Sequence, residues 1–176
     1  MNLFKKIGIL ALSVLLLFSL QLTPNPVSAD AVPGDVVVTL GQDLTQEQQD
    51  QILREMGVDR SVEIIYVTNE EEHRYLGHLL SKATIGKRAL SSAKITLKQS
   101  GSGISIKTRN ITTITNAMYA NAVITAGVKD VDIYVTAPIP VSGTAGLTGI
   151  IKAFEKATGK TISEKTLQTW KDASIF

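Results

Sequence analysis

The chain of 176 residues is 44% hydrophobic and 19% charged, contains no cysteine, and carries a formal net charge of +2. This length suits one globular domain with a buried core, and the apolar content argues against a wholly disordered chain. The lack of cysteine excludes a disulfide scaffold, a thiolate metal site and a cysteine nucleophile.

The N-terminus has the pattern of a signal peptide. Two lysines precede an uncharged, leucine-rich run over residues 7–20, which is short for a membrane-spanning helix. Two prolines then break the helix, and small residues precede Asp30. We expect residues 1–29 to be removed on export by cleavage between Ala29 and Asp30; the alternative is an uncleaved N-terminal anchor.

Charge is distributed unevenly along the chain that remains. Residues 30–72 contain 11 acids and two bases, residues 73–129 contain nine bases and no acid, and residues 130–176 contain five of each. A net charge near zero therefore conceals an acidic segment followed by a basic one.

The first predicted elements are a strand and a helix. The β-branched run over residues 36–40 predicts a buried strand. Thr45 and Gln48 have the spacing of a capping box, so we expect a helix to begin there and to end at Gly57.

A second strand is predicted over residues 62–68, and strand, helix and strand in succession indicate a parallel pair. Asn69 is the expected cap of the next helix. Three glutamates follow it, in the first turn, where the helix dipole favours anions.

The middle of the chain predicts a β-hairpin. Apolar and polar residues alternate over residues 93–98 and again over residues 104–109, and Ser100-Gly101-Ser102-Gly103 lies between them. Alternation of this kind places Ile95 and Ile106 on the buried face of the sheet.

Two further helices flank a last strand. Thr115 is the expected cap of a helix that ends at Gly127, and residues 131–136 predict a buried strand that two prolines end. A glycine-rich segment then opens a helix that ends at Gly159, and Ser163 caps a short final one. We expect residues 30–176 to form one α/β domain (α+β is the alternative) with a mixed sheet of about five strands and four or five helices.

The basic segment supplies the first candidate binding site. If the isoleucines of the hairpin are buried, the basic residues between them share the opposite face. The candidate polyanion-binding residues are Lys87, Arg88, Lys94, Lys98, Lys107 and Arg109. We expect a cell-wall polyanion or an anionic envelope surface rather than nucleic acid, because no aromatic residue interleaves these bases. The alternative is that acidic helices neutralise this face or that it is simply solvated.

A second candidate is the loop Ser142-Gly143-Thr144, which follows a buried strand and opens a helix, where backbone N–H groups can bind an anion. The alternative is that Gly146 and Gly149 let this helix pack closely on the sheet.

Catalytic and metal-binding patterns are weak. His73 and His78 lie on different faces of a helix, the G-x-S-x-G motif of many hydrolases is absent, and Ser81 stands where a P-loop needs glycine. We therefore assign no catalytic residue, no metal site and no cofactor.

Four segments in order resemble the YpuA-like secreted proteins of firmicutes, a family of unknown function: Gly34–Thr45, Glu71–Gly77, Ile85–Ile95 and Asn116–Glu155. The resemblance implies an exported Gram-positive protein with no assigned activity, and a chain shorter at its C-terminus than other members. We expect a non-catalytic binding or structural protein, secreted or at the cell envelope. The alternative is an extracytoplasmic, hydrolase-like enzyme with its site at the Gly/Ser/Thr-rich loop after the last strand.

Overall fold

One mixed β-sheet, with strand order β2-β1-β3-β5-β4, organises the computed structural model, which describes residues 33–159 and 161–162. β1 lies parallel to β2, and β4 lies parallel to β5, whereas β3 is antiparallel to both of its neighbours, β1 and β5. The strands are β1 (Val36–Gly41), β2 (Glu63–Val67), β3 (Ser92–Leu97), β4 (Ile104–Ile111) and β5 (Val131–Val141). The predicted α/β fold and the parallel first pair are confirmed.

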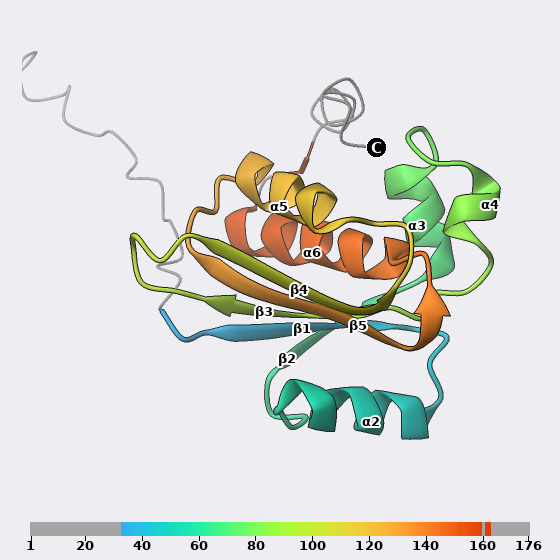
Figure 1. The fold of residues 1–176 in the computed structure, drawn as a ribbon, viewed down its shortest axis with the longest axis horizontal. Coiled ribbons are helices and arrows are strands. Elements are labelled where there is room, and N and C mark those ends of the chain that lie inside the picture. Colours follow the sequence, from blue (N-terminus) through green and yellow to red (C-terminus); the bar gives the residue numbers. More distant parts are fainter. Residues whose placement is uncertain (1–32, 160, 163–176) are drawn as a thin grey trace, which may run out of the picture. The chain divides into compact units, whose positions relative to one another are not determined.

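Five helices accompany this sheet within the described residues: α2 (Gln46–Met56), α3 (Asn69–Leu76), α4 (Lys82–Ile85), α5 (Asn116–Thr125) and α6 (Thr144–Thr158). α5 and α6 cover one face of the sheet and α2 covers the other, while α3 and α4 lie at one end (Figure 1). None of these helices has the length and apolar character needed to cross a membrane. The predicted signal peptide and the helix expected after Ser163 lie outside the described residues.

Threonines cap three of the described helices, α2, α3 and α5. The capping box of Thr45 and Gln48 is present as predicted, and Thr115 caps α5. The cap of α3 is Thr68 rather than the predicted Asn69, because the Thr68 hydroxyl accepts from the Glu71 N–H while the Glu71 carboxylate accepts from the Thr68 N–H.

The predicted hairpin is wrong, because β5 lies between β3 and β4. Ile133 of β5 is the register partner of Ile95 on one side and of Ile106 on the other. Alternation determines which face a residue occupies but not which strand lies beside it. The segment between β3 and β4 therefore crosses the end of β5 instead of making a tight turn.

β5 also continues beyond the two prolines expected to end it. Val141 still pairs with Ile111 of β4, past an irregularity at Asn110, whose φ is 58° and whose side-chain amide donates to the Ala137 carbonyl at 2.8 Å. On the β3 side of β5, the pairing ends at Ser92, which lies opposite Thr136. The prolines come after this point, where no β3 residue needs the N–H group that proline lacks.

The sheet separates two apolar clusters. The larger one packs β3, β4 and β5 against α5 and α6, and it includes Ile95 and Ile133. The smaller one packs β1 and β2 against α2. A Cβ atom at Gly149 would lie 2.3 Å from the Thr39 hydroxyl oxygen, and one at Gly146 would lie 2.6 Å from a Val135 methyl carbon. The alternative interpretation of these glycines, close packing of the helix on the sheet, is therefore confirmed.

Candidate functional site

An open groove of about 590 Å³ lies between the loop after α4 and the end of β5. One wall carries Lys87 and Arg88, and the other carries Thr112, Thr113 and Ser142. The groove therefore brings together residues from both predicted sites, two from the basic set and one from the loop that opens α6.

The two cations are presented on a loop whose backbone is fixed. Gly86 has a φ of 82°, and the Ala89 N–H directly after the cations donates to the Asp43 carboxylate at 2.7 Å. Both Lys87 and Arg88 are exposed, and within the described part of the chain neither side chain has an ion pair or a hydrogen bond. Their charges are available to a ligand in the groove.

The opposite wall is held by the segment after β4. The Thr112 N–H and hydroxyl both donate to the Val141 carbonyl, at 2.9 and 3.0 Å, and the Thr113 N–H donates to the Ser142 carbonyl at 3.3 Å. These contacts fix the backbone from which the Ser142 side chain projects.

A chain of polar side chains leads inward from this wall. The Ser142 and Thr144 hydroxyl oxygens are 3.0 Å apart, and the Thr144 hydroxyl donates to Oε1 of Glu72 at 2.6 Å. Oε2 of Glu72 accepts from the Asn69 amide at 3.0 Å. Glu72 is only 1% exposed, and this burial raises the pKa of its carboxyl even though both donors favour the charged form.

Side chains of α3 also hold the loop that carries the cations. Nε2 of His73 lies 3.1 Å from the Gly86 carbonyl, to which it donates, and the Asn69 amide lies 3.4 Å from the same oxygen. His78 is exposed. Among the described residues, no three potential metal ligands cluster together.

The rest of the predicted anion loop faces the interior. Gly143 and Thr144 are buried, and the Gly143 carbonyl accepts from the Tyr119 hydroxyl at 2.9 Å. In the first turn of α6, the Gly146 N–H donates to the Ser91 hydroxyl at 2.8 Å. Of the three loop residues, Ser142 is the one that lines the groove.

The other four basic residues, on β3 and β4 or directly after β3, do not line the groove and lie on or beside the face that α2 packs against. Arg109 forms an ion pair with Glu55 of α2, Lys94 donates to the Met56 carbonyl, and Lys98 lies 3.1 Å from Asp132. Lys107 is exposed. The alternative, that acidic residues neutralise this face, therefore describes two of the four residues, Arg109 and Lys98.

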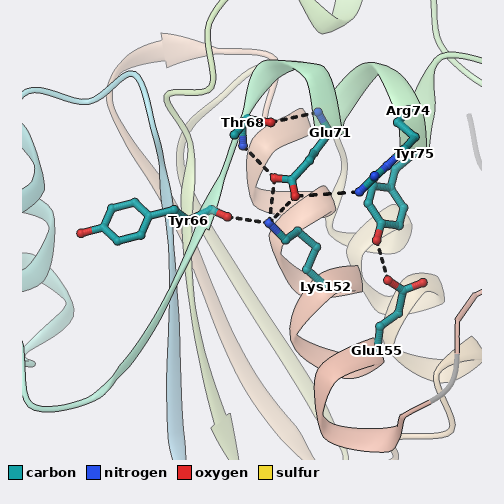
Figure 2. Close-up of polar contacts among 7 residues, drawn as sticks. All are labelled: Tyr66, Thr68, Glu71, Arg74, Tyr75, Lys152 and Glu155. Atoms are coloured by element: carbon teal, nitrogen blue, oxygen red, sulfur yellow. Dashed lines mark hydrogen bonds and ion pairs between the residues drawn. The ribbon is translucent and has the colours of Figure 1, made fainter.

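Lys152 of α6 joins α3 to α6 through Glu71 (Figure 2). Its ammonium group donates to both carboxylate oxygens of Glu71 at 2.7 Å and to the Tyr66 carbonyl at 2.6 Å. Burial of Glu71 opposes ionisation, but Lys152 and the Thr68 N–H outweigh it and lower the pKa of Glu71. The next residue of α3, Glu72, is the one that accepts from Thr144.

Sequence reasoning missed Glu72, Asn69 and the two threonines of the groove. One signal for Glu72 was available, because it precedes the buried Leu76 by four residues and therefore shares a helix face with it. A carboxylic acid on the apolar side of a helix indicates a buried group with a specific partner.

These features define a class of protein: a mixed five-stranded α/β domain with a groove at one end of its sheet that is lined by cations and hydroxyl groups. A family model described as "Protein of unknown function (DUF1002)" matches residues 40–172, and the chain belongs to this family. It is 51% identical over 162 residues to "Uncharacterized protein YpuA" of Bacillus subtilis (strain 168), which confirms the resemblance. The match covers 92% of this chain and 54% of that protein, so the chain spans about half the length of this relative. No solved structure matches the chain.

Proposed function

We propose that this protein is an exported, non-catalytic binding protein of the cell envelope whose groove holds a phosphodiester polyanion. One observation carries the proposal: Lys87 and Arg88 have no partner among the described residues and line the same groove as the hydroxyl groups of Thr113 and Ser142. Guanidinium and ammonium groups are the usual partners of phosphate oxygens, and hydroxyl groups complete such sites.

The groove is a better candidate than the basic strands because of how the charges are used. Arg109, Lys94 and Lys98 already interact with carboxylate or carbonyl oxygens, so a polyanion would have to replace those contacts. The groove cations carry no such cost. An open groove also suits a polymer that continues past the site on both sides.

The enzymatic alternative has less support from the geometry. The one side-chain partner of the Ser142 hydroxyl within the described residues is the Thr144 hydroxyl. A serine nucleophile needs a general base such as histidine or lysine within hydrogen-bond reach. Binding without turnover is therefore the function that this arrangement favours.

Binding is tested by two matched double variants of the secreted protein. Lys87→Gln with Arg88→Gln removes the cations of the groove, and Lys98→Gln with Lys107→Gln removes the same charge from the sheet face. Retention on purified poly(glycerol phosphate) should fall about tenfold for the first pair and change little for the second. Equal losses would point to unspecific attraction, and unchanged retention of the groove variant would refute the proposal.

Export is part of the proposal and is supported by the lysines, the apolar run and the small residues that precede Asp30. It is tested by expression in a Gram-positive host, fractionation of the culture and N-terminal sequencing of the protein recovered outside the membrane. We expect a chain that begins at Asp30. A chain that remains inside the cell with residues 1–29 attached would contradict export.

A further inference from the structure

The hydrogen-bond chain from the groove to Glu72 has a direction, because each hydroxyl group carries a single proton. When Glu72 is ionised, the Thr144 hydroxyl donates to it over 2.6 Å. Thr144 then has no proton left for Ser142, so Ser142 must donate across the 3.0 Å contact to Thr144. In this state the Ser142 oxygen offers the groove lone pairs alone, which an anion avoids.

Protonation of Glu72 reverses this chain. The Asn69 amide occupies Oε2 as a donor at 3.0 Å, so the carboxylic proton belongs on Oε1, where it donates to Thr144. The Thr144 hydroxyl then donates to Ser142. The proton of Ser142 is thereby released and can be donated to a ligand in the groove.

We propose that Glu72 is a proton-controlled switch: when it is neutral, Ser142 becomes a hydrogen-bond donor to a phosphodiester oxygen in the groove, and the groove binds that anion more tightly. The identity of the ligand rests on the proposed function. The reversal of the hydrogen bonds rests only on the side chains of Asn69, Glu72, Thr144 and Ser142 and is independent of any ligand.

The surroundings of Glu72 suit a group that changes its protonation state. Asn69 and His73 face it from α3, Thr144 from α6, and Asp43 from the segment after β1. The charge of Asp43 favours the neutral form and that of His73 the ionised form. No cation forms an ion pair with Glu72 in the described residues, whereas its neighbour Glu71 is paired with Lys152. Burial, the largest influence, raises the pKa of Glu72, so the proton binds in milder acid than for an exposed glutamate.

The first experiment needs no ligand. Carbon-13 resonances of the Glu72 carboxyl and of Ser142 Cβ are followed by NMR through an acid titration. The two should move with one common midpoint. In Thr144→Val, the relay is broken, and the Ser142 resonance should stop following Glu72, whereas Thr144→Ser should preserve the coupling. A Ser142 resonance that ignores Glu72 in the natural protein, or that still follows it in Thr144→Val, would overturn the switch.

The second experiment measures the affinity for poly(glycerol phosphate) by calorimetry at one pH below and one pH above the Glu72 midpoint found by NMR, and a phosphodiester keeps its charge at both. The natural protein should bind about tenfold more tightly in acid, the effect of one hydrogen bond to a charged group. Glu72→Gln, whose amide donates permanently to Thr144, should keep the tighter affinity at both values. Glu70→Gln, the same change at an exposed position on α3, should behave like the natural protein. His73→Gln should retain the pH dependence if Glu72 is its source.

The two proposals fail in different ways. Absence of binding at both pH values would refute the proposed function, while the NMR titration still decides whether the switch exists. Binding with equal affinity at both values would refute the control of the groove by Glu72 and leave the proposed function intact. Loss of the pH dependence in His73→Gln, with its persistence in Glu72→Gln, would assign the effect to the histidine and overturn the switch.

Discussion

Arg109 of β4 forms an ion pair with Glu55 of α2, 54 positions earlier in the chain. The same carboxylate accepts hydrogen bonds from the Tyr134 hydroxyl and, at 2.9 Å, from the Thr136 hydroxyl. The acidic segment of the sequence thus folds directly against the basic one. Segregated charges in this chain serve in part to hold a helix on a sheet.

Removal of the Glu55 charge should destabilise the protein in a pH-dependent way. Burial opposes ionisation of Glu55, but hydrogen bonds from Tyr134, Thr136 and Arg109 outweigh it and lower its pKa. A lowered folded-state pKa stabilises the protein above the unfolded-state value, and this stabilisation disappears as the pH falls through the folded-state value. We expect Glu55→Gln to lower the free energy of unfolding by about 1–3 kcal/mol at neutral pH and by much less in acid. Urea denaturation at both pH values checks this, and an equal loss in both would contradict it.

Two lysines of α6 should differ in their contribution to stability. Lys152 is 19% exposed at its side chain and bonds three oxygens, whereas Lys156 is 67% exposed and pairs with Glu63. Lys152→Met leaves the Glu71 carboxylate poorly compensated and should cost about 1–3 kcal/mol. Lys156→Met should change the free energy of unfolding by about 0.5 kcal/mol or less. Thermal unfolding of the two variants measures the difference, and similar losses would refute this account.

Tyr75 should ionise late in an alkaline titration. Burial and the hydrogen bond to Glu155 raise the pKa of its hydroxyl to about 12. Because an unfolded tyrosine loses its proton at about pH 10, the stabilisation is present below that value and declines as the pH rises toward 12. The tyrosinate absorbance of the natural protein minus that of Tyr75→Phe should show this late midpoint. Titration of Tyr75 at the unfolded value while the protein stays folded would contradict the prediction.

Alanine at position 149 should destabilise α6 although alanine favours helices. Its Cβ would lie 2.6 Å from the Cβ atom of Thr39, which cannot move without moving β1. Overpacking of this kind outweighs the gain in helix propensity, and we expect a net loss of about 1–2 kcal/mol. Ala157, which is exposed on the same helix, is the control. There, Ala157→Gly should lower the free energy of unfolding by about 0.5–1 kcal/mol. A gain in stability from Gly149→Ala would refute the close contact.

The sequence predicts faces better than it predicts neighbours. The alternation around Ile95 and Ile106 correctly indicates their inward direction, because a strand repeats every two residues whichever strand lies beside it. The pairing was misassigned because a Ser-Gly turn between two alternating strands is the usual sign of a hairpin. Insertion of β5 depends on the fit of Ile133 between β3 and β4. This is a long-range interaction, which a local sequence pattern does not predict.

The site illustrates the same limit. Glu70, Glu71 and Glu72 are equivalent as acids in a first helical turn, yet one is exposed, one is paired with Lys152 and one is buried. Which of them turns inward depends on the phase of α3, set by its cap, and on the position of α6, which begins more than 70 residues later. The groove itself combines loops from three regions of the chain, so its cations and Ser142 were predictable only as separate sites, and Thr112 and Thr113 were not predicted.

The interior position of β5 has a consequence for the order in which the chain folds. β3 and β4 are complete by Ile111, but each lacks a neighbour until Val131–Val141 arrives between them. A growing chain therefore exposes two open strand edges and cannot close its larger core until α6, too, has been made. Such a topology delays cooperative folding until nearly the whole described length is available.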